Sequence, residues 1–201
     1  VLDACAAPGS KTSQMAALMA AQGELIAVET VRGRYYKLRA VCELLGVRNV
    51  RFRQADARKL HFESEYFDKV LVDAPCSSEG RFKASDPESY AYWSERKIKE
   101  MSHKQKGILL NSARGLKVGG RLVYSTCTFA PEENEEVVDW FLTKTQGLFR
   151  LMAPDLPGVK CYPALSAWKK REYKNDLTAC RRILPDRVFS GFFIACMIRE
   201  K

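Results

Sequence analysis

Two cysteines, Cys76 and Cys127, each follow a short apolar run of the sequence, and Asp73 stands just before one of them. An ionised thiol can attack an electrophilic carbon, and a carboxyl group can donate or accept a proton. The two runs, 70–72 and 122–126, contain β-branched residues and are bounded by turn formers, which predicts buried parallel strands. Ligands of an open α/β sheet bind at the carboxyl ends of such strands. If the two strands are neighbours, we therefore expect these three side chains to line one pocket.

Small residues replace glycines in a turn near the start of the sequence. The segment 3–12 reads DACAAPGSKT, and Cys5, Ala7 and Gly9 stand at the spacing of a G-x-G-x-G turn. Small side chains at these positions let a ligand approach the backbone at a helix N-terminus. Glu29 follows Gly9 by about 20 residues, at the tip of the next expected strand, where an acid accepts hydrogen bonds from ribose hydroxyls. The turn and the acid together predict a nucleoside site.

The residues Gly9-Ser10-Lys11-Thr12 also resemble the end of a phosphate-binding P-loop. The P-loop pattern, G-x-x-x-x-G-K-[ST], requires two glycines, one of them directly before the lysine. In this sequence Cys5 and Ser10 hold the two glycine positions. We therefore reject a P-loop nucleoside triphosphatase.

The order of strand and helix patterns predicts an α/β domain. Residues 1–29 indicate a βαβ unit, in which Ser10 caps the helix and Gly23 ends it. Pro131 and the acids of 132–136 suit a helix start, so we interpret those acids as helix chemistry and not as metal ligands. The expected helices cover 12–21, 32–45, 95–116 and a segment from 131, and the expected strands cover 1–3, 25–28, 51–55, 70–72, 122–127 and a terminal hairpin of 182–185 with 191–198.

Length and composition set further limits. The 201 residues suit one compact domain with a sizeable core, and 46% of them are hydrophobic. No stretch is long and apolar enough to span a membrane. The sequence opens inside an expected strand, so we expect it to be the C-terminal part of a longer protein. The net charge of +9 favours a polyanionic partner such as nucleic acid, and it suits a solvated basic surface equally well.

The seven cysteines include no Cys-x-x-Cys pair, and their odd number argues against a full disulfide framework. The two histidines, His61 and His103, lie far from the cysteines in sequence, so we expect no metal site. Free thiols suit a reducing compartment, which predicts a cytoplasmic protein, or a nuclear or nucleolar one in a eukaryote. We interpret five cysteines as small buried hydrophobic residues, namely Cys5, Cys42, Cys161, Cys180 and Cys196.

Two further features each keep two interpretations. Asp56 stands at the tip of the expected third strand, where it either meets an adenine amino group or caps its own loop. Aromatic and cationic side chains alternate in 162–174, which suits stacking on single-stranded nucleic acid and equally a loop packed on the domain. The polar segment 77–94 is a long loop at the mouth of the expected pocket, and such loops are often functional.

These motifs resemble those of the Sun family of RNA cytosine-5 methyltransferases, which use S-adenosylmethionine. The resemblance covers nearly the whole chain. Its most specific part is the presence of both cysteine motifs, DAPC at 73–76 and YSTC at 124–127. It also includes the DACAAPGSKT turn, Glu29, the EENEE run at 132–136 and Gly191-Phe192-Phe193.

The resemblance implies an α/β fold of the Rossmann-like class I methyltransferase type. That fold has a seven-stranded, mostly parallel sheet with a C-terminal antiparallel hairpin and with helices on both faces. The resemblance further implies that residues 1–201 are the catalytic domain, and that the N-terminal RNA-binding part of the family lies outside them. The implied partner is RNA, either rRNA or tRNA, with no membrane and no metal, and the sequence does not define the oligomeric state.

By the same resemblance, Cys127 is the nucleophile and Cys76 is the second cysteine, which helps release the product. The Cys127 thiolate would add to carbon 6 of cytosine and make carbon 5 nucleophilic towards the methyl group. Asp73, in its protonated form, would donate to ring nitrogen 3. The implied residues for binding or surrounding S-adenosylmethionine are Ala7, Pro8, Gly9, Ser10, Lys11, Glu29, Asp56 and Asp73.

Two other functions stay open. One is an RNA-binding assembly factor with an inactive methyltransferase fold, although the presence of Asp73, Cys76 and Cys127 speaks against it. The other is a DNA cytosine-5 methyltransferase in which Cys76 attacks. The chain also departs from the family pattern, because Ser77-Ser78-Glu79-Gly80 stands where Ser-Gly-x-Gly is usual and Asp186 stands where a histidine is common. We expect the first departure to alter the loop over the target base.

Overall fold

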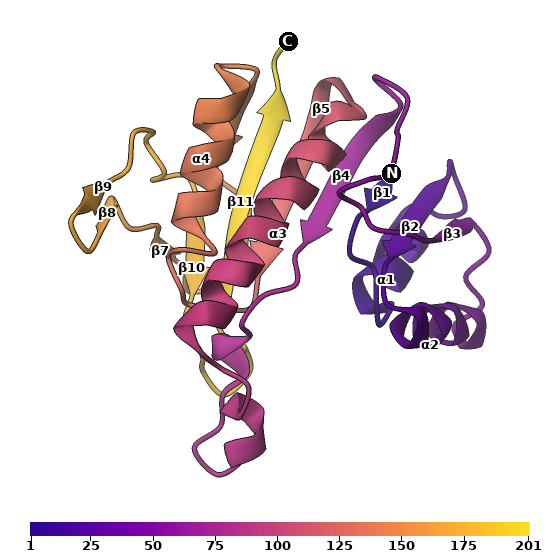
Figure 1. Ribbon diagram of the computed structural model, residues 1–201. Helices are drawn as coiled ribbons and strands as arrows, with labels where there is room; N and C mark the ends of the chain where they lie inside the picture. The colour runs from indigo at the N-terminus through magenta and orange to yellow at the C-terminus, as the bar shows by residue number, and fades with distance from the viewer.

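The computed structural model describes all residues, 1–201, and shows a nine-stranded mixed sheet covered by helices (Figure 1). The strands follow the order β3-β2-β1-β4-β5-β11-β10-β7, and β6 pairs with β11. The strands are β1 (Leu2–Asp3), β2 (Leu25–Glu29), β3 (Val50–Gln54), β4 (Phe67–Asp73), β5 (Leu116–Thr126), β6 (Phe149–Met152), β7 (Tyr162–Pro163), β10 (Arg181–Ile183) and β11 (Phe192–Arg199), with a separate hairpin of β8 (Ala167–Trp168) and β9 (Arg171–Glu172). The helices are α1 (Ser10–Leu18), α2 (Arg32–Leu44), α3 (Glu95–Arg114) and α4 (Glu135–Thr145), with two short 3-10 helices, η1 (Glu79–Arg81) and η2 (Pro87–Tyr90).

The first five strands of this order are all parallel to their neighbours. Helices α1, α2 and α3 form the crossovers between such strands, and crossovers of this kind are right-handed. After β3 the chain passes to the other side of β1 to form β4, so the direction of winding reverses and α3 falls on the opposite face from α1 and α2. The reversal creates a switch point at the carboxyl ends of β1 and β4, where ligands of such sheets bind.

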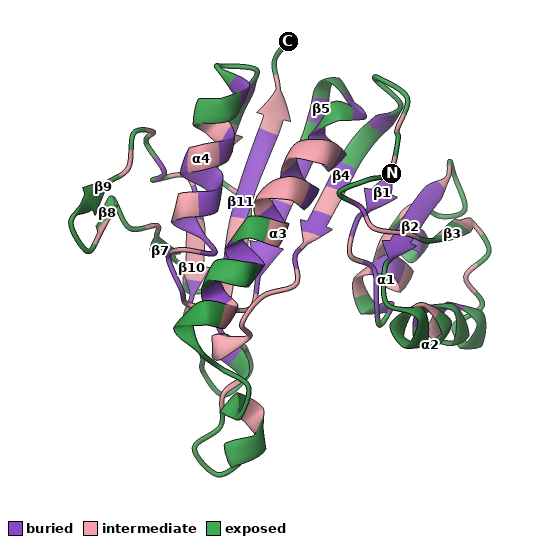
Figure 2. Cartoon of the chain, in the orientation of Figure 1, coloured by how far each residue is buried: buried purple, intermediate pink, exposed green.

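Alternate residues of β2 enter two hydrophobic clusters. Ile26 and Val28 belong to the larger cluster, to which α3 and α4 contribute, whereas Ala27 packs with Leu38 and Cys42 of α2. Because successive strand side chains point to opposite faces, this part of the sheet is buried on both sides. Figure 2 shows burial along much of β11 and exposure of much of the segment between β4 and α3. None of the helices combines the length and the hydropathy that crossing a membrane requires.

The fold class expected from the sequence is confirmed, including the antiparallel hairpin of β10 and β11. The number of strands is nine and not seven, because β6 and β7 were not expected. β6 and β10 share one edge of β11, since β10 pairs with its beginning and β6 with its end. These two unexpected strands have four and two residues, which is too short for a period of two to be recognised.

The first helix is shorter than expected. It begins at Ser10 with Gly9, and not Ser10, as its N-cap, and it ends at Leu18. Ala20 and Ala21 then adopt left-handed backbone angles, with φ of 47° and 60°. These two residues therefore belong to a turn, although alanine favours a helix.

Two other boundaries also differ from the expected ones. α4 begins at Glu135, because residues 131–134 form a hydrogen-bonded turn in front of it. β5 already begins at Leu116, so the glycines expected to precede this strand lie within it. Gly119 has a φ of 77° there, and the pairing of β4 with β5 shifts register at this point. The glycines thus form an irregularity inside a long strand.

The segment with alternating aromatic and cationic side chains packs against the start of α4. Trp168 Nε1 donates to Glu132 Oε1 at 3.0 Å, and Lys169 Nζ lies 2.9 Å from the same oxygen. Arg171 lies 3.5 Å from Asp139 of α4. Since these groups bind the acids of the domain itself, the structure supports the interpretation as a packed loop.

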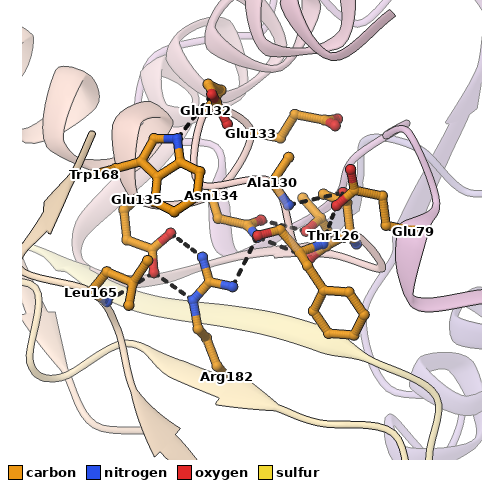
Figure 3. Close-up of polar contacts among 12 residues, drawn as sticks. Glu79, Thr126, Ala130, Glu132, Glu133, Asn134, Glu135, Leu165, Trp168 and Arg182 are labelled. Carbon is orange, nitrogen blue, oxygen red and sulfur yellow. Dashed lines mark hydrogen bonds and ion pairs between the residues drawn. The ribbon is translucent and has the colours of Figure 1, made fainter. Parts of the chain in front are cut away.

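A buried ion pair joins the first turn of α4 to β10. Arg182 Nε and Nη2 donate to the two carboxylate oxygens of Glu135 at 2.6 and 2.5 Å (Figure 3). Arg182 Nη1 also donates to the carbonyl oxygen of Phe129 at 3.0 Å. The Glu135 side chain is 0% exposed and that of Arg182 is 12% exposed. Such a two-pronged contact compensates both charges away from water.

Replacing Arg182 by leucine leaves the Glu135 carboxylate buried without its partner. We therefore expect the free energy of unfolding to fall by about 3–5 kcal/mol. The matched control is Arg150→Leu, because Arg150 pairs with Glu200 at 2.6 Å on the exposed surface, where ion pairs contribute little. Urea unfolding followed by circular dichroism measures both variants. Equal losses in the two would contradict the assigned importance of the buried pair.

Candidate active site

A cleft of about 740 Å³ opens at the carboxyl ends of β1, β2, β4 and β5. This volume lies in the range of about 300–1,000 Å³ that is typical of small-molecule sites. The turn after β1 lines one part of it, and the loop after β4 lines another. Among the residues predicted from the sequence, the cleft is lined by Ala7, Pro8, Ser10, Lys11, Glu29, Asp56, Asp73, Cys76 and Cys127, and Gly9 is absent from the lining.

Gly9 serves the packing of the turn. Its φ is +114°, which side-chain-bearing residues rarely adopt, and a Cβ there would lie 3.2 Å from Val41 and 3.3 Å from Leu38 of α2. Arg34 Nη2, also from α2, donates to the carbonyl oxygen of Ala7 at 2.7 Å. Helix α2 thus lies directly against one side of the turn, while the turn lines the cleft with its other residues.

The two cysteines meet within this cleft. β4 and β5 are adjacent and parallel, with Asp73 opposite Ser125, so the segments that follow the two strands start at the same edge of the sheet. Cys76 Sγ and Cys127 Sγ are 3.3 Å apart, and both residues are half-buried. At this distance one sulfur donates a hydrogen bond to the other. The structure therefore brings together the thiols that the sequence singled out.

The surroundings of the pair favour the proton on Cys76. The hydrogen bond with Cys76, and then the positive charge of Arg81 and the hydroxyl of Ser78, lower the pKa of Cys127, although burial and Asp73 oppose them. The same hydrogen bond, together with burial, raises the pKa of Cys76. Cys127 is therefore the thiol that ionises first, and the thiolate is the reactive form of cysteine.

Asp73 is bound through both carboxylate oxygens. Lys11 Nζ lies 2.7 Å from Oδ2, and Ser125 Oγ donates to Oδ1 at 2.8 Å. Lys11 Nζ also lies 5.3 Å from the centre of the Phe192 ring, which lines the same cleft. Because Lys11 comes from the turn after β1 and Ser125 from β5, Asp73 links the two halves of the cleft.

Two further carboxylates lie at the tips of β2 and β3. Glu29 has a side chain 4% exposed, and its Oε1 accepts a hydrogen bond from the backbone N–H of Val31 at 2.8 Å. Asp56 Oδ1 accepts from the backbone N–H of Arg58 at 3.0 Å, and the side-chain hydrogen bond with Arg58 lowers the pKa of Asp56. Asp56 therefore caps its own loop while it lines the cleft, and its contact with an adenine stays a prediction.

Sequence reasoning missed Asp3, which ends β1 and lines the cleft. Thr12 Oγ1 donates to Asp3 Oδ2 at 2.7 Å, whereas Oδ1 is buried without a partner. Burial raises the pKa of Asp3 to about 6. The available signal was an acid at the first position of the DACAAPGSKT segment, to which we assigned no role of its own. A buried acceptor without a partner suits a ligand that carries a donor or a positive charge.

The other cysteines divide into two groups. Cys42, Cys180 and Cys196 are buried, as expected, whereas Cys5 and Cys161 are only half-buried. The expectation of a buried hydrophobic residue is therefore wrong for the last two. Cys5 lines the cleft, and burial raises the pKa of its thiol, which disfavours a reactive thiolate there.

The loop after β4 makes a close backbone contact with the segment before β11. A Cβ on Gly80 would lie 2.5 Å from the carbonyl oxygen of Gly191, and Gly191 N donates to Gly80 O at 3.3 Å. Gly80 N also donates to the carbonyl oxygen of Cys127 at 2.9 Å. These contacts hold the loop after β4, which carries Cys76, against Cys127.

Asp186, where the family commonly has a histidine, is exposed and accepts two backbone hydrogen bonds from the turn that follows it.

The parallel sheet, its switch-point cleft and the terminal antiparallel hairpin define a Rossmann-like methyltransferase fold. The solved structure of NSun6 from Pyrococcus horikoshii with SFG matches with a TM-score of 0.81 and 31% identity, covering 100% of this chain and 47% of that chain. A methyltransferase homologue from Pyrococcus horikoshii matches with a TM-score of 0.79 and 34% identity, covering 98% of this chain and 60% of the other.

The chain belongs to the family described as 16S rRNA methyltransferase RsmB/F, which matches residues 1–198. It is 46% identical over 148 residues to ribosomal RNA small subunit methyltransferase F of Vibrio cholerae serotype O1, covering 73% of this chain and 31% of that protein. It is 39% identical over 196 residues to tRNA (cytosine(49)-C(5))-methyltransferase of Pyrococcus abyssi, covering 97% of this chain and 62% of that protein. The chain thus spans less than two thirds of these relatives. The matches confirm the expected relationship to the Sun-type RNA cytosine-5 methyltransferases.

The pKa of Asp3 makes stability depend on pH. Because its folded pKa of about 6 lies above the unfolded value of about 3.9, the folded state holds the proton longer, and stability falls as the pH rises from about 4 to 6. Asp3→Asn removes this ionisation. We expect the variant to be more stable than the wild type at pH 8 by roughly 2–3 kcal/mol and nearly equal to it at pH 4.

Urea unfolding at a series of pH values measures the effect of Asp3→Asn. Asp68→Asn is the control, because Lys117 lowers the pKa of the Asp68 carboxyl, so its removal should weaken the fold slightly at pH 8. A gain from Asp3→Asn that is the same at pH 4 and pH 8 would show that ionisation of Asp3 is not its cause.

Proposed function

We propose that residues 1–201 form the catalytic domain of an S-adenosylmethionine-dependent RNA cytosine-5 methyltransferase. One observation carries this proposal: two sulfur atoms 3.3 Å apart lie in the same cleft as the small-residue turn and Glu29. A protein that only binds RNA has no use for a thiol pair with one readily ionised member. The names of the relatives support RNA as the substrate, since one names ribosomal RNA and another a cytosine of tRNA.

The cleft fits S-adenosylmethionine in size and in the distribution of its polar groups. Glu29 would accept hydrogen bonds from the ribose hydroxyls, and Asp56 would meet the adenine amino group. Residues 7–11 and the unpartnered oxygen of Asp3 would hold the amino-acid end, whose ammonium group supplies donors. When bound, this cofactor supplies an electrophilic methyl group on its sulfonium.

The first chemical step belongs to Cys127. Its thiolate adds to carbon 6 of cytosine, forming a carbon–sulfur bond and breaking the π bond between carbons 5 and 6. The displaced electron pair makes carbon 5 nucleophilic enough to take the methyl group. Asp73 would pass a proton to ring nitrogen 3 and so neutralise the charge that the attack places on the ring; the proton comes from Lys11, whose Nζ lies 2.7 Å from Asp73 Oδ2.

The second step removes the enzyme from the product. Carbon 5 loses its proton to water or to a base in the cleft, the electron pair re-forms the double bond, and the Cys127 thiolate leaves carbon 6. Ring nitrogen 3 returns its proton to Asp73 and Lys11. Cys76 is placed to help, because its sulfur lies 3.3 Å from the departing sulfur and its raised pKa keeps it protonated. A thiol donor at that position stabilises the leaving thiolate. Without Cys76, the bond between enzyme and RNA should persist.

The site also restricts the form of the RNA. Both cysteines are half-buried inside the cleft, so a cytosine stacked in a duplex cannot bring carbon 6 to Cys127. The target base must therefore come from a single-stranded loop or from an opened duplex. The net charge of +9 suits attraction to the phosphate backbone of such an rRNA or tRNA segment.

We expect Cys127→Ala to lose methyl transfer by roughly a thousandfold or more, because the covalent route disappears with the nucleophile. We expect Cys76→Ala to accumulate protein covalently bound to RNA. Methyl-labelled S-adenosylmethionine with rRNA and tRNA measures the transfer, and denaturing gel electrophoresis reveals the adduct. Cys161→Ala is the matched control, since it removes a half-buried thiol outside the cleft and should keep the activity.

The same variants separate the other two functions. A DNA methyltransferase would lose activity with Cys76→Ala, would keep it with Cys127→Ala and would prefer DNA. An assembly factor would bind RNA in all three variants and would transfer no methyl group in any of them. Either pattern would exclude the proposed function.

A further inference from the structure

A serine next to the thiol pair holds a backbone conformation that suits glycine. Ser78, the N-cap of η1, has φ 63° and ψ 26°, in the left-handed region that residues with a Cβ rarely adopt. It stands where the related family usually has a glycine, while the other glycine of that pattern, Gly80, is kept. Strained backbone conformations cluster at functional sites, so the side chain of Ser78 is a candidate for a role at the thiol pair.

The Ser78 hydroxyl lies close to both sulfur atoms. Its Oγ accepts a hydrogen bond from Cys127 Sγ at 3.7 Å and lies 3.9 Å from Cys76 Sγ, and its hydroxyl donates to the carbonyl oxygen of Cys76 at 3.4 Å. The first two distances are long hydrogen bonds to sulfur. A hydroxyl accepts from a thiol and donates to a thiolate, so it can follow the change in protonation of the pair. A glycine at this position offers no such group.

The groups that face Cys127 come from several elements. Cys76, Ser78 and Arg81 lie in the loop after β4, and Asp73 lies at the end of β4. Lys11, bound to Asp73, and Lys104 of α3 line the same cleft. Among all these side chains, those of Cys76 and Ser78 hydrogen-bond the Cys127 sulfur.

We propose that Ser78 is a positioning residue that acts through Cys127. When Cys127 ionises, the Ser78 hydroxyl turns from the carbonyl oxygen of Cys76 and donates a hydrogen bond to the thiolate. This hydrogen bond stabilises the charge and holds the sulfur towards the cleft. In this chain the hydroxyl therefore contributes, together with Cys76 and Arg81, to the early ionisation of the nucleophile. The inference rests on the proposed function only in giving Cys127 the role of nucleophile, because the hydrogen bond itself needs neither cofactor nor RNA.

The test is the pH dependence of thiol alkylation, measured for the Cys127 peptide by mass spectrometry after timed exposure to iodoacetamide. Alkylation reports the thiolate and requires no methyl transfer. We expect Ser78→Ala to raise the midpoint by about one pH unit, which reduces the alkylation rate about tenfold below the midpoint. Ser78→Gly should raise the midpoint equally, because it also lacks the hydroxyl.

The matched control is Ser77→Ala, which removes the neighbouring hydroxyl. Ser77 Oγ lies 2.7 Å from Thr128 Oγ1, and no hydrogen bond joins it to either sulfur. This variant should leave the midpoint unchanged. Unchanged midpoints in both Ser78 variants would overturn the inference. So would a shift with Ser78→Ala but not with Ser78→Gly, which would assign the effect to the backbone, or a shift of the same size with Ser77→Ala.

A parallel pH profile of methyl transfer separates this inference from the proposed function. If the wild type methylates RNA and the Ser78 variants keep the alkylation midpoint, the function stands and the inference fails. If the midpoint shifts as expected and the wild type transfers no methyl group, the hydrogen bond stands and the proposed function fails.

Discussion

The hydrogen-bonded register between β4 and β5 is the constraint on which the site depends. Asp73 lies opposite Ser125, and Ala74 N donates to Ser125 O at 2.9 Å, so the two strands end together. A slip of one residue would turn every side chain of a strand to the other face of the sheet and would separate the two cysteines. The core prevents such a slip, because both strands carry side chains that are almost completely buried, namely Val70, Val72, Leu122 and Tyr124.

A second set of contacts supports the loop that carries Cys76. The buried carboxylate of Glu133 accepts hydrogen bonds from Ser77 N at 3.1 Å and from Gln105 Nε2 at 2.7 Å. Burial nevertheless raises the pKa of Glu133 to about 7, so holding this charge in the interior costs stability at neutral pH. The acids that the sequence indicated as a helix start therefore have separate tasks. Glu132 binds Trp168 and Glu135 pairs with Arg182 (Figure 3), whereas Glu133 accepts from Ser77.

Patterns of neighbouring residues in the sequence were sufficient to predict the parallel strands and the turns that follow them. Apolar runs with β-branched residues predicted the parallel strands, and the turn formers after them predicted which side chains would reach one edge of the sheet. Properties that arise from contacts between distant segments could not be predicted in this way. Asp3 looked like a strand residue, and its burial follows from the position of β1 between β2 and β4. The left-handed backbone of Ser78 lies in a loop that Gly191 contacts from the far end of the chain.

The position of β11 has a consequence for biosynthesis. This strand is the last of the sheet in chain order, yet it lies inside the sheet, where it pairs with β5 along Arg121–Thr126. Gly191, just before β11, contacts the loop that carries Cys76. A nascent polypeptide on the ribosome therefore carries its helices and its first five strands while the edge of β5 is still bare, and β6 and β10 cannot pair before β11 is made. Chains that end between residues 127 and 191 consequently contain both cysteines and lack the strand and the glycine that support them. Release of such a product leaves the thiol pair without β11 beside it.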